Sequence, residues 1–187
     1  MTTIDAKEQL LQTVIKMMED AKDISKITNR QIAAEADVNS ALINYYFQSK
    51  DNLLLEAVNT HMENLYKAIM ESISNESNPV IRLKSMLMKF LELGISQYKF
   101  VKIPVSEEMK TGGITTNKMI QQTLKEIYKE EKSDFELQIL ASQILLPLQT
   151  IYLHIDEYKN YLNVNLDNTQ ILHQLVDTIF TNLNISE

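Results

Sequence analysis

Apolar residues recur along the chain at intervals of three and four positions, the spacing that places side chains on one face of a helix. The first such segment, from Asp5 to Ala21, predicts an amphipathic helix. Thr28, with Gln31 three residues later, predicts a capping box at the start of a second helix. Another helix is expected to begin at Ser49 and to reach about residue 74, which is longer than a small N-terminal group of helices needs.

The second half of the chain continues the same periodicity. The break at residues 74–78 is followed by Pro79, a residue that favours the first turn of a helix. From there the pattern predicts helices over 79–100, around Pro104, and over 118–131, 135–158 and 169–183. Together with the N-terminal segments, this predicts an all-α protein of about nine helices.

The last two predicted helices carry apolar residues around more than one face. Such a helix must be buried on more than one side, and a second copy of the chain is the expected partner. The alternative is that these residues all belong to the core of a single chain. The candidate dimer-interface residues are Leu145, Leu148, Tyr152, Leu172, Leu175, Val176 and Ile179.

Composition narrows the class of protein. Three glycines and three prolines in 187 residues favour long helices with short connections. The absence of cysteine excludes disulfides, cysteine-ligated zinc and cysteine nucleophiles. No apolar run reaches the length of a membrane span, so a soluble, cytoplasmic protein is expected. The net charge of -7 argues against indiscriminate nucleic-acid binding, but it leaves open specific binding through one face.

The segment "NRQIAAEADVNSALINYYFQSKDNLL", residues 29–54, has the pattern of a helix-turn-helix. A tight turn at residues 37–39 separates two short helices, and Asn39 or Ser40 can cap the second. Small and polar residues lie on the side of this helix away from Ile43 and Phe47, where asparagine and alanine can contact base edges. These residues are Ser40, Ala41, Asn44 and Tyr45. The alternative is a polar, solvated face on an ordinary three-helix core.

This segment closely resembles the DNA-binding signature of the TetR (tetracycline-repressor) family of bacterial regulators. The match extends over about residues 9–58. The residues that carry it are Thr28, Ile32 and Ala33, the turn residues Asp37, Val38 and Asn39, the aromatic run Tyr45, Tyr46 and Phe47, and the helix entry Ser49, Lys50 and Leu53. The chain departs from the family pattern at Asp37, where glycine is usual, and at Asn44, where tyrosine is common. The second departure is expected to alter the operator sequence rather than to abolish binding.

The resemblance implies a helix-turn-helix DNA-binding domain over residues 1–48, a connecting helix and linker over 49–78, and a ligand-binding and dimerisation domain over 79–187. It further implies that phosphates are contacted by Thr28, Arg30, Tyr46 and Lys50. Bases or the groove wall would be contacted by Ser40, Ala41, Asn44 and Tyr45, with Asn39 beside them at the turn.

A ligand pocket is expected among the middle helices. Its candidate lining residues are Met62, Tyr66, Met86, Phe90, Tyr98, Met109 and Met119. Methionine adapts to varied apolar ligands, which favours an apolar or amphipathic small molecule, although methionine and aromatic residues at helical spacing are also ordinary core residues. No cofactor is expected.

These features predict a homodimeric repressor that a small ligand releases from a palindromic operator, by shifting the population of settings of the fourth helix. Residues 1–60 hold six basic and nine acidic side chains, so specificity is expected to need two heads on two half-sites. The main alternative is an interaction or adaptor protein that keeps the fold without ligand control. An enzyme ranks third, because His61, His154 and His173 have no metal-binding spacing and no nucleophile or phosphate-loop motif is present.

Overall fold

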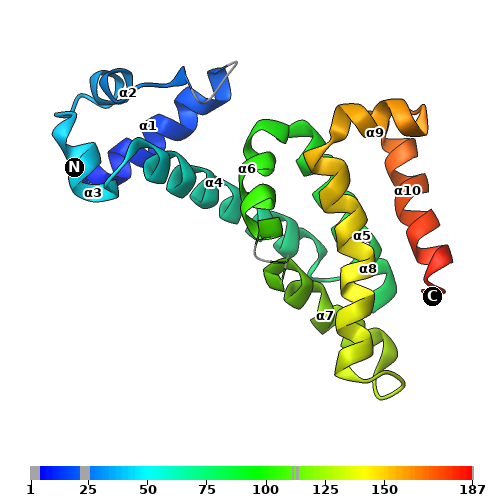
Figure 1. The fold of residues 1–187 in the computed structure, drawn as a ribbon. Helices are drawn as coiled ribbons and strands as arrows, with labels where there is room; N and C mark the ends of the chain where they lie inside the picture. Colours follow the sequence, from blue (N-terminus) through cyan, green and yellow to red (C-terminus); the bar gives the residue numbers. More distant parts are fainter. Residues whose placement is uncertain (1–4, 22–25, 111, 113, 187) are drawn as a thin grey trace. The chain divides into compact units, whose positions relative to one another are not determined.

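In the computed structural model of the chain, residues 5–21, 26–110, 112 and 114–186 are described, and they form ten α-helices (Figure 1). The helices are α1 (Ala6–Asp20), α2 (Asn29–Glu35), α3 (Ala41–Phe47), α4 (Lys50–Ile73), α5 (Pro79–Ser96), α6 (Tyr98–Lys110), α7 (Ile114–Tyr128), α8 (Asp134–Leu153), α9 (Ile155–Leu162) and α10 (Thr169–Asn182). No strand occurs within these ranges, which confirms the all-α prediction.

The chain divides into two compact units, one ending at Asn64 and the other beginning at Leu65. The division lies inside α4, so this helix contributes to both units. In the first unit, α1 packs against α2 and α3. Its fully buried core contains Leu10, Val14, Met18, Ile32, Ile43, Leu53 and Ala57.

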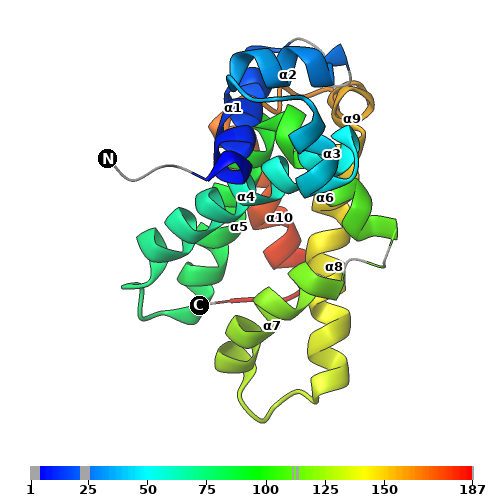
Figure 2. The same cartoon turned by 90° about the vertical axis from the view of Figure 1, so that its left-hand side faces the viewer.

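The second unit is built around α5, which contacts α6, α7, α8 and α10 (Figure 2). α7 and α8 also pack along each other. Fully buried apolar side chains from α5, α7, α8 and α10 form its core. Leu83, Leu87, Leu91, Ile120, Leu124, Ala141, Ile144 and Val176 are among them.

Helix starts follow the predicted caps. Thr28 and Gln31 form the complete capping box of α2, and Pro79 lies in the first turn of α5. Ser49 precedes α4 and its hydroxyl accepts a hydrogen bond from the backbone N–H of Asn52, at 3.1 Å. Local side-chain chemistry therefore sets where these helices begin.

α7 begins at Ile114, four residues before the predicted start. Two helix breaks also differ from the sequence pattern, and the second of them raises the count from nine to ten. The helix predicted to reach residue 100 ends at Ser96, and α6 starts at Tyr98 and contains Pro104. The Gln97 carbonyl accepts hydrogen bonds from Phe100 and Val101, which starts a new helix before the proline. The helix predicted over 135–158 is interrupted at His154, with φ -130° and ψ 45°. Apolar periodicity continues through both breaks, so it does not reveal them.

Candidate functional site

α3 presents one exposed face of small and polar side chains. Ile43 is fully buried and Phe47 is 3% exposed, which fixes the orientation of the helix in the first unit. Tyr45 is 77% exposed, a high value for an aromatic ring in a compact unit. Ser40, Ala41 and Asn44 are exposed with it, whereas Tyr46 is half-buried. The residues predicted to face bases therefore share one solvent-facing surface.

The turn before α3 has the left-handed backbone conformation at Asp37, the position where the family pattern usually has glycine. Asp37 has φ 49°, and aspartate tolerates this region better than most residues. The N–H of Val38 then bonds to the Ala33 carbonyl at 3.0 Å, which closes the end of α2. The side-chain amide of Gln9 in α1 donates to the Ala36 carbonyl at 2.7 Å and holds this end against α1.

Asn39 performs the capping that the sequence assigned to either Asn39 or Ser40. Its side-chain oxygen accepts a hydrogen bond from the Ala41 N–H at 2.9 Å. Ser40 makes no capping bond through its side chain within the described part of the chain, and it is exposed at the start of α3. Its hydroxyl is thus available for a contact outside the chain.

The residues predicted to contact phosphates lie at helix ends around α3. Thr28 is at the N-terminus of α2, Tyr46 is in the last turn of α3, and Lys50 is the first residue of α4. Arg30 is exposed in the first turn of α2. Helix N-termini also offer backbone N–H groups, which suit phosphate oxygens.

Lys7 connects α1 to α3 and α4 through two side-chain contacts. Its ammonium group forms an ion pair with Glu56 of α4 at 2.8 Å and lies 5.5 Å from the centre of the Phe47 ring. The hydrogen bond that the Lys7 ammonium donates to Glu56, followed by the charge of the same carboxylate, raises the pKa of Lys7 above its ordinary value. The lysine is exposed, so its contribution to stability is small.

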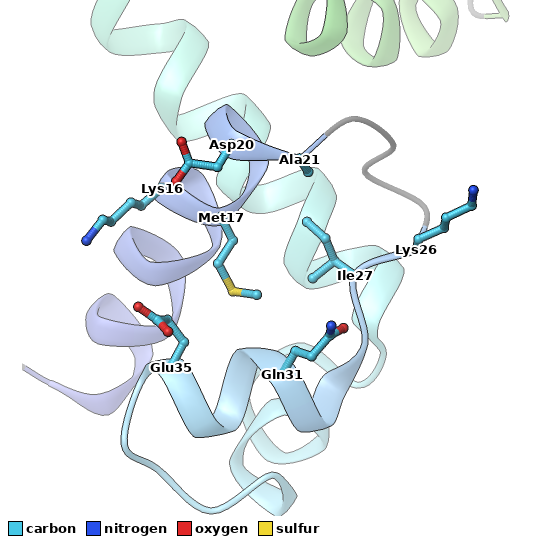
Figure 3. A pocket seen from close by; sticks show the side chains of 8 residues that line it. All are labelled: Lys16, Met17, Asp20, Ala21, Lys26, Ile27, Gln31 and Glu35. Atoms are coloured by element: carbon cyan, nitrogen blue, oxygen red, sulfur yellow. The ribbon is translucent and has the colours of Figure 1, made fainter.

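The first unit also has a shallow groove between α1 and α2 (Figure 3). Met17 and Ile27 face each other across it, and its rim carries charges of both signs. The described lining residues are Lys16, Met17, Asp20, Ala21, Lys26, Ile27, Gln31 and Glu35. Since all of them come from α1, α2 and the connection between those helices, the groove is separate from the exposed face of α3.

The second unit contains a mainly apolar cavity of about 210 Å³. Its described lining residues are Tyr66, Leu87, Phe90, Leu93, Val101, Val105, Glu108, Thr116, Met119, Leu145, Leu148, Gln149 and Tyr152. Tyr66 comes from α4 and the others from α5 to α8. The cavity is therefore in contact with the helix that continues into the first unit.

Three of the seven predicted pocket residues line this cavity: Tyr66, Phe90 and Met119. Met62 belongs to the first unit, and both Met62 and Met86 are almost fully buried in cores. Tyr98 and Met109 are half-buried on α6 and lie outside the described lining set. Helical spacing identified apolar residues, but it did not show which of them face an empty space.

The polar part of the cavity was not anticipated from the sequence. The Glu108 carboxylate accepts a hydrogen bond from the Thr116 N–H at 2.6 Å and a second bond from the Thr116 hydroxyl. Gln149 is 4% exposed, and its amide N–H donates to Glu108 over a long 3.5 Å. Gln149 is a polar residue within an otherwise apolar stretch of α8, and this position in the sequence could have indicated a polar group inside the cavity.

Two tyrosines complete the cavity wall. The Tyr152 hydroxyl donates to the Phe90 carbonyl, and its ring lies against Gly94, where any Cβ would clash with it. Burial, with a smaller contribution from Tyr66, raises the pKa of Tyr152 well above 10. The pKa of Tyr66 is also raised, first by burial and then by the negative charge of Glu108. Both hydroxyls therefore stay protonated at neutral pH.

Most of the predicted interface residues are already buried within one chain. Leu145, Leu148, Tyr152, Leu172 and Val176 are each at most 7% exposed, while Leu175 and Ile179 are half-buried. α8 uses much of its apolar surface against α6 and α7. Its large exposed apolar side chains are Phe135 (71%), Ile139 (46%) and Leu146 (39%). We call these three the outer α8 residues.

Neither metal-ligand clusters nor membrane-spanning helices occur in the described part of the chain. Within it, no group of three or more histidine, aspartate or glutamate side chains is placed to hold a metal ion. No helix there is both long and apolar enough to cross a membrane.

Comparison with known proteins agrees with the geometry of the first unit. Residues 20–57 match the family described as "Bacterial regulatory proteins, tetR family". The nucleoid occlusion factor SlmA of Pasteurella multocida is 23% identical over 88 residues. That match covers 47% of this chain and 44% of SlmA, so the aligned segment spans less than half of the curated relative.

Solved structures with the same fold cover nearly the whole chain. FadR of Thermus thermophilus, a TetR-family transcriptional repressor in complex with lauroyl-CoA, has a TM-score of 0.69 at 14% identity over 97% of this chain and 96% of its own. A TetR-like transcriptional regulator from Rhodococcus sp. RHA1 has a TM-score of 0.61 at 13% identity over 100% of both chains. At these identities the likeness establishes the fold.

Proposed function

We propose that this chain is a member of the tetR family of bacterial regulatory proteins, that it binds a palindromic operator as a homodimer, and that a small ligand releases it. The observation that carries the proposal is the exposed face of α3 within a helix-turn-helix of this family. Asn44 would read a base edge, and Ser40 and Ala41 would let the helix backbone approach the major groove. Such a regulator would act in the cytoplasm, where bacterial DNA lies.

The net charge of the chain supports binding by a dimer that has two DNA-binding domains. The chain carries a net charge of -7, so attraction to phosphates alone would give weak binding. A dimer that engages two half-sites at once gains affinity through effective concentration without additional positive charge. The phosphate contacts would then come from Thr28, Arg30, Tyr46 and Lys50, with Asn39 holding the turn between α2 and α3.

The outer α8 residues support dimerisation. Phe135, Ile139 and Leu146 are large apolar side chains exposed on one long helix, which is the kind of surface that a second copy can cover. The half-buried Leu175 and Ile179 of α10 would join them. The contact would resemble a helical bundle in which Leu145, Leu148, Tyr152, Leu172 and Val176 support the surface from within.

The internal cavity supports control by a ligand. Tyr66 of α4 lines it, and α4 also supplies Leu53 and Ala57 to the core of the first unit. A ligand that binds better when α4 has one setting shifts the population toward that setting. If that setting places the α3 helices of the two subunits at a distance that does not match the two half-sites, the operator is released. The lauroyl-CoA complex of the similar FadR is a precedent for a ligand in this fold.

Selection of bound duplexes from a random DNA pool tests the proposal. We expect purified protein to enrich a palindrome whose half-site centres lie about one helical turn or a multiple apart. A variant with Asn44→Ala, Tyr45→Ala and Lys50→Ala should enrich nothing. A folded dimer that enriches no motif at moderate salt would contradict autonomous operator binding.

An adaptor that keeps this fold is the alternative. The relative SlmA is named as a nucleoid occlusion factor and not as a transcriptional regulator. An adaptor should bind DNA without any response to ligands. Enrichment of a palindrome together with a failure of every ligand to alter DNA binding would favour it.

A further inference from the structure

The cavity of the second unit contains a carboxylate and a buried amide whose oxygen has no partner among the described residues. Glu108 and Gln149 line it from α6 and α8, facing walls that are otherwise mainly aliphatic and aromatic. The Gln149 side-chain oxygen is buried and has no hydrogen-bond partner among the described residues. A buried amide oxygen without a partner is unfavourable, so this atom is expected to be satisfied when the cavity is filled.

The orientation of the Gln149 amide follows from its neighbour. Its N–H group points to the Glu108 carboxylate, 3.5 Å away, because an amide oxygen in that place would repel the carboxylate. The opposite orientation would therefore be less stable. What Gln149 offers to a ligand is consequently an acceptor, in the same cavity as a carboxylate.

Two hydroxyl groups of the cavity are engaged within the chain. The Tyr152 hydroxyl donates to the Phe90 carbonyl, and the Thr116 hydroxyl donates to Glu108. The rings of Tyr66 and Phe90 form an edge-to-face pair with centres 5.3 Å apart and lie in the same wall. Aromatic faces attract a nearby cation through their quadrupole. Acceptors, a carboxylate and aromatic rings together suit a positively charged donor.

We propose that the ligand of this cavity is a small amphiphile with a protonated amine, whose ammonium group bonds to Glu108 and to the Gln149 oxygen while its apolar body lies among the aliphatic walls. An ammonium carries three donors, so it can bond to the unpartnered Gln149 oxygen and to the Glu108 carboxylate at the same time. A carboxylate or phosphate head would instead face the charge of Glu108. The proposal rests on the proposed function only in its premise that this cavity holds a ligand.

The size of the cavity also limits the ligand. At about 210 Å³ it is smaller than the roughly 300–1,000 Å³ typical of pockets for drug-sized ligands. A short alkyl or single-ring amine fits this volume better than a long acyl chain joined to a nucleotide. The lauroyl-CoA of the similar FadR is therefore a precedent for binding in this fold and not for the chemistry of this ligand.

Titration calorimetry with hexylamine, hexan-1-ol and hexanoate tests the head group, since the three share one alkyl chain. Hexylamine is protonated at pH 7, as the lysine side chain is. We expect it to bind the wild-type protein at least about tenfold more tightly than either of the others. Equal or tighter binding of hexanol or hexanoate, or no heat from hexylamine at about 10 mM, would overturn the proposal.

A comparison of Glu108→Gln with the matched control Glu107→Gln tests whether the preference for hexylamine arises in the cavity. The Glu108→Gln side chain keeps an oxygen that can accept from Thr116 but loses the charge, so the preference for hexylamine should fall to less than about threefold. Glu107 is an exposed neighbour paired with Lys110, and Glu107→Gln should keep the full preference. Preference retained in Glu108→Gln would contradict the proposal. If that variant does not fold, the wild-type series alone still decides it.

The calorimetry contains no DNA, which separates this proposal from the proposed function. Hexylamine that binds with the expected dependence on Glu108 but leaves the operator bound would support the head-group assignment and contradict ligand release. Release of the operator by hexanoate without release by hexylamine would support ligand control and overturn the amine assignment.

Discussion

Asn44 is an exposed amide on the face of α3 that the proposal places in the major groove. An asparagine side chain can make two hydrogen bonds to adenine, worth about 1–3 kcal/mol of discrimination between bases. Asn44→Ala should therefore relax the base preference at one position in each half-site. Selection from a random duplex pool, followed by sequencing, would measure the change.

Two other variants provide the comparison. Lys50→Ala should weaken binding to every sequence and lower the salt dependence by about one phosphate contact. Asn160→Ala, an exposed site on α9 in the second unit, should change neither property. Equal loss of affinity on all sequences for Asn44→Ala would contradict base reading by this residue.

Gly94 is required by the close approach of the Tyr152 ring. A Cβ at position 94 would overlap the ring of Tyr152. Gly94→Ala should lower the free energy of unfolding by about 1–3 kcal/mol, the usual cost of overpacking. Urea denaturation would measure it. In a Tyr152→Leu background the same substitution should cost little, and an undiminished cost there would contradict the steric explanation.

Tyr152 should also make the protein less stable in alkali. Its folded-state pKa is raised well above 10 by burial, whereas in the unfolded chain the hydroxyl ionises near pH 10. Below about pH 10 both states are protonated, so the residue adds no pH dependence. At higher pH the unfolded state loses its proton first, and the free energy of unfolding falls.

Denaturation at several pH values above 9 would test this effect. Tyr152→Phe should show a shallower fall than the wild type, while some slope should remain because the pKa of Tyr66 is raised as well. Tyr161→Phe, at an exposed tyrosine of α9, should follow the wild type. Identical slopes for all three proteins would show that Tyr152 ionises alike in both states.

At the scale of the element, α8 begins with a complete capping box. Ser133 accepts a hydrogen bond from the N–H of Glu136, and the Glu136 carboxylate accepts from both the hydroxyl and the N–H of Ser133. These bonds lower the pKa of Glu136 below its ordinary value. The cap thereby fixes the first turn of the helix that supplies both the cavity and the outer α8 residues.

Ser133→Ala should destabilise the protein by about 0.5–2 kcal/mol, because α8 loses its N-terminal cap. Thermal or urea denaturation would measure the loss. The matched control is Ser72→Ala, since Ser72 lies exposed within α4 and bonds only to a carbonyl of its own helix in the described structure. A control that is destabilised as much as Ser133→Ala would argue against a specific role for the cap.

At the scale of the whole molecule, the outer α8 residues decide the oligomeric state in our proposal. Ile139→Glu would place a charge at the centre of the proposed dimer contact, where it could not be hydrated. The variant should sediment as a monomer in analytical ultracentrifugation. It should also bind the operator about a hundredfold more weakly, because only one half-site is engaged at a time.

Ile114→Glu is the matched control, because Ile114 is likewise a large exposed apolar side chain, on α7. It should remain a dimer and keep its operator affinity. An Ile139→Glu protein that still sediments as a dimer would contradict the role of this surface.

Much of the fold could be predicted because helix formation depends on near neighbours. The caps at Thr28 and Pro79, the turn at Asp37 and the buried face of α3 all depend on residues within a few positions of one another. The break at His154 was not predicted, and the break at Gln97 was predicted too late in the chain, since the apolar period continues across both positions. A helix end without a local breaker is set by packing against distant segments.

The sequence by itself determined the all-helical class and the helix-turn-helix pattern, with its likeness to the tetR family over residues 20–57, because each depends on spacings of three or four residues. Only the tertiary structure decided which apolar side of α8 is buried within its own chain. The side that stays exposed carries Phe135, Ile139 and Leu146. It also brought Glu108 and Gln149, 41 positions apart, into one cavity. The physical reason is that burial and the meeting of polar groups depend on which helices pack together, and a one-dimensional pattern does not specify that pairing.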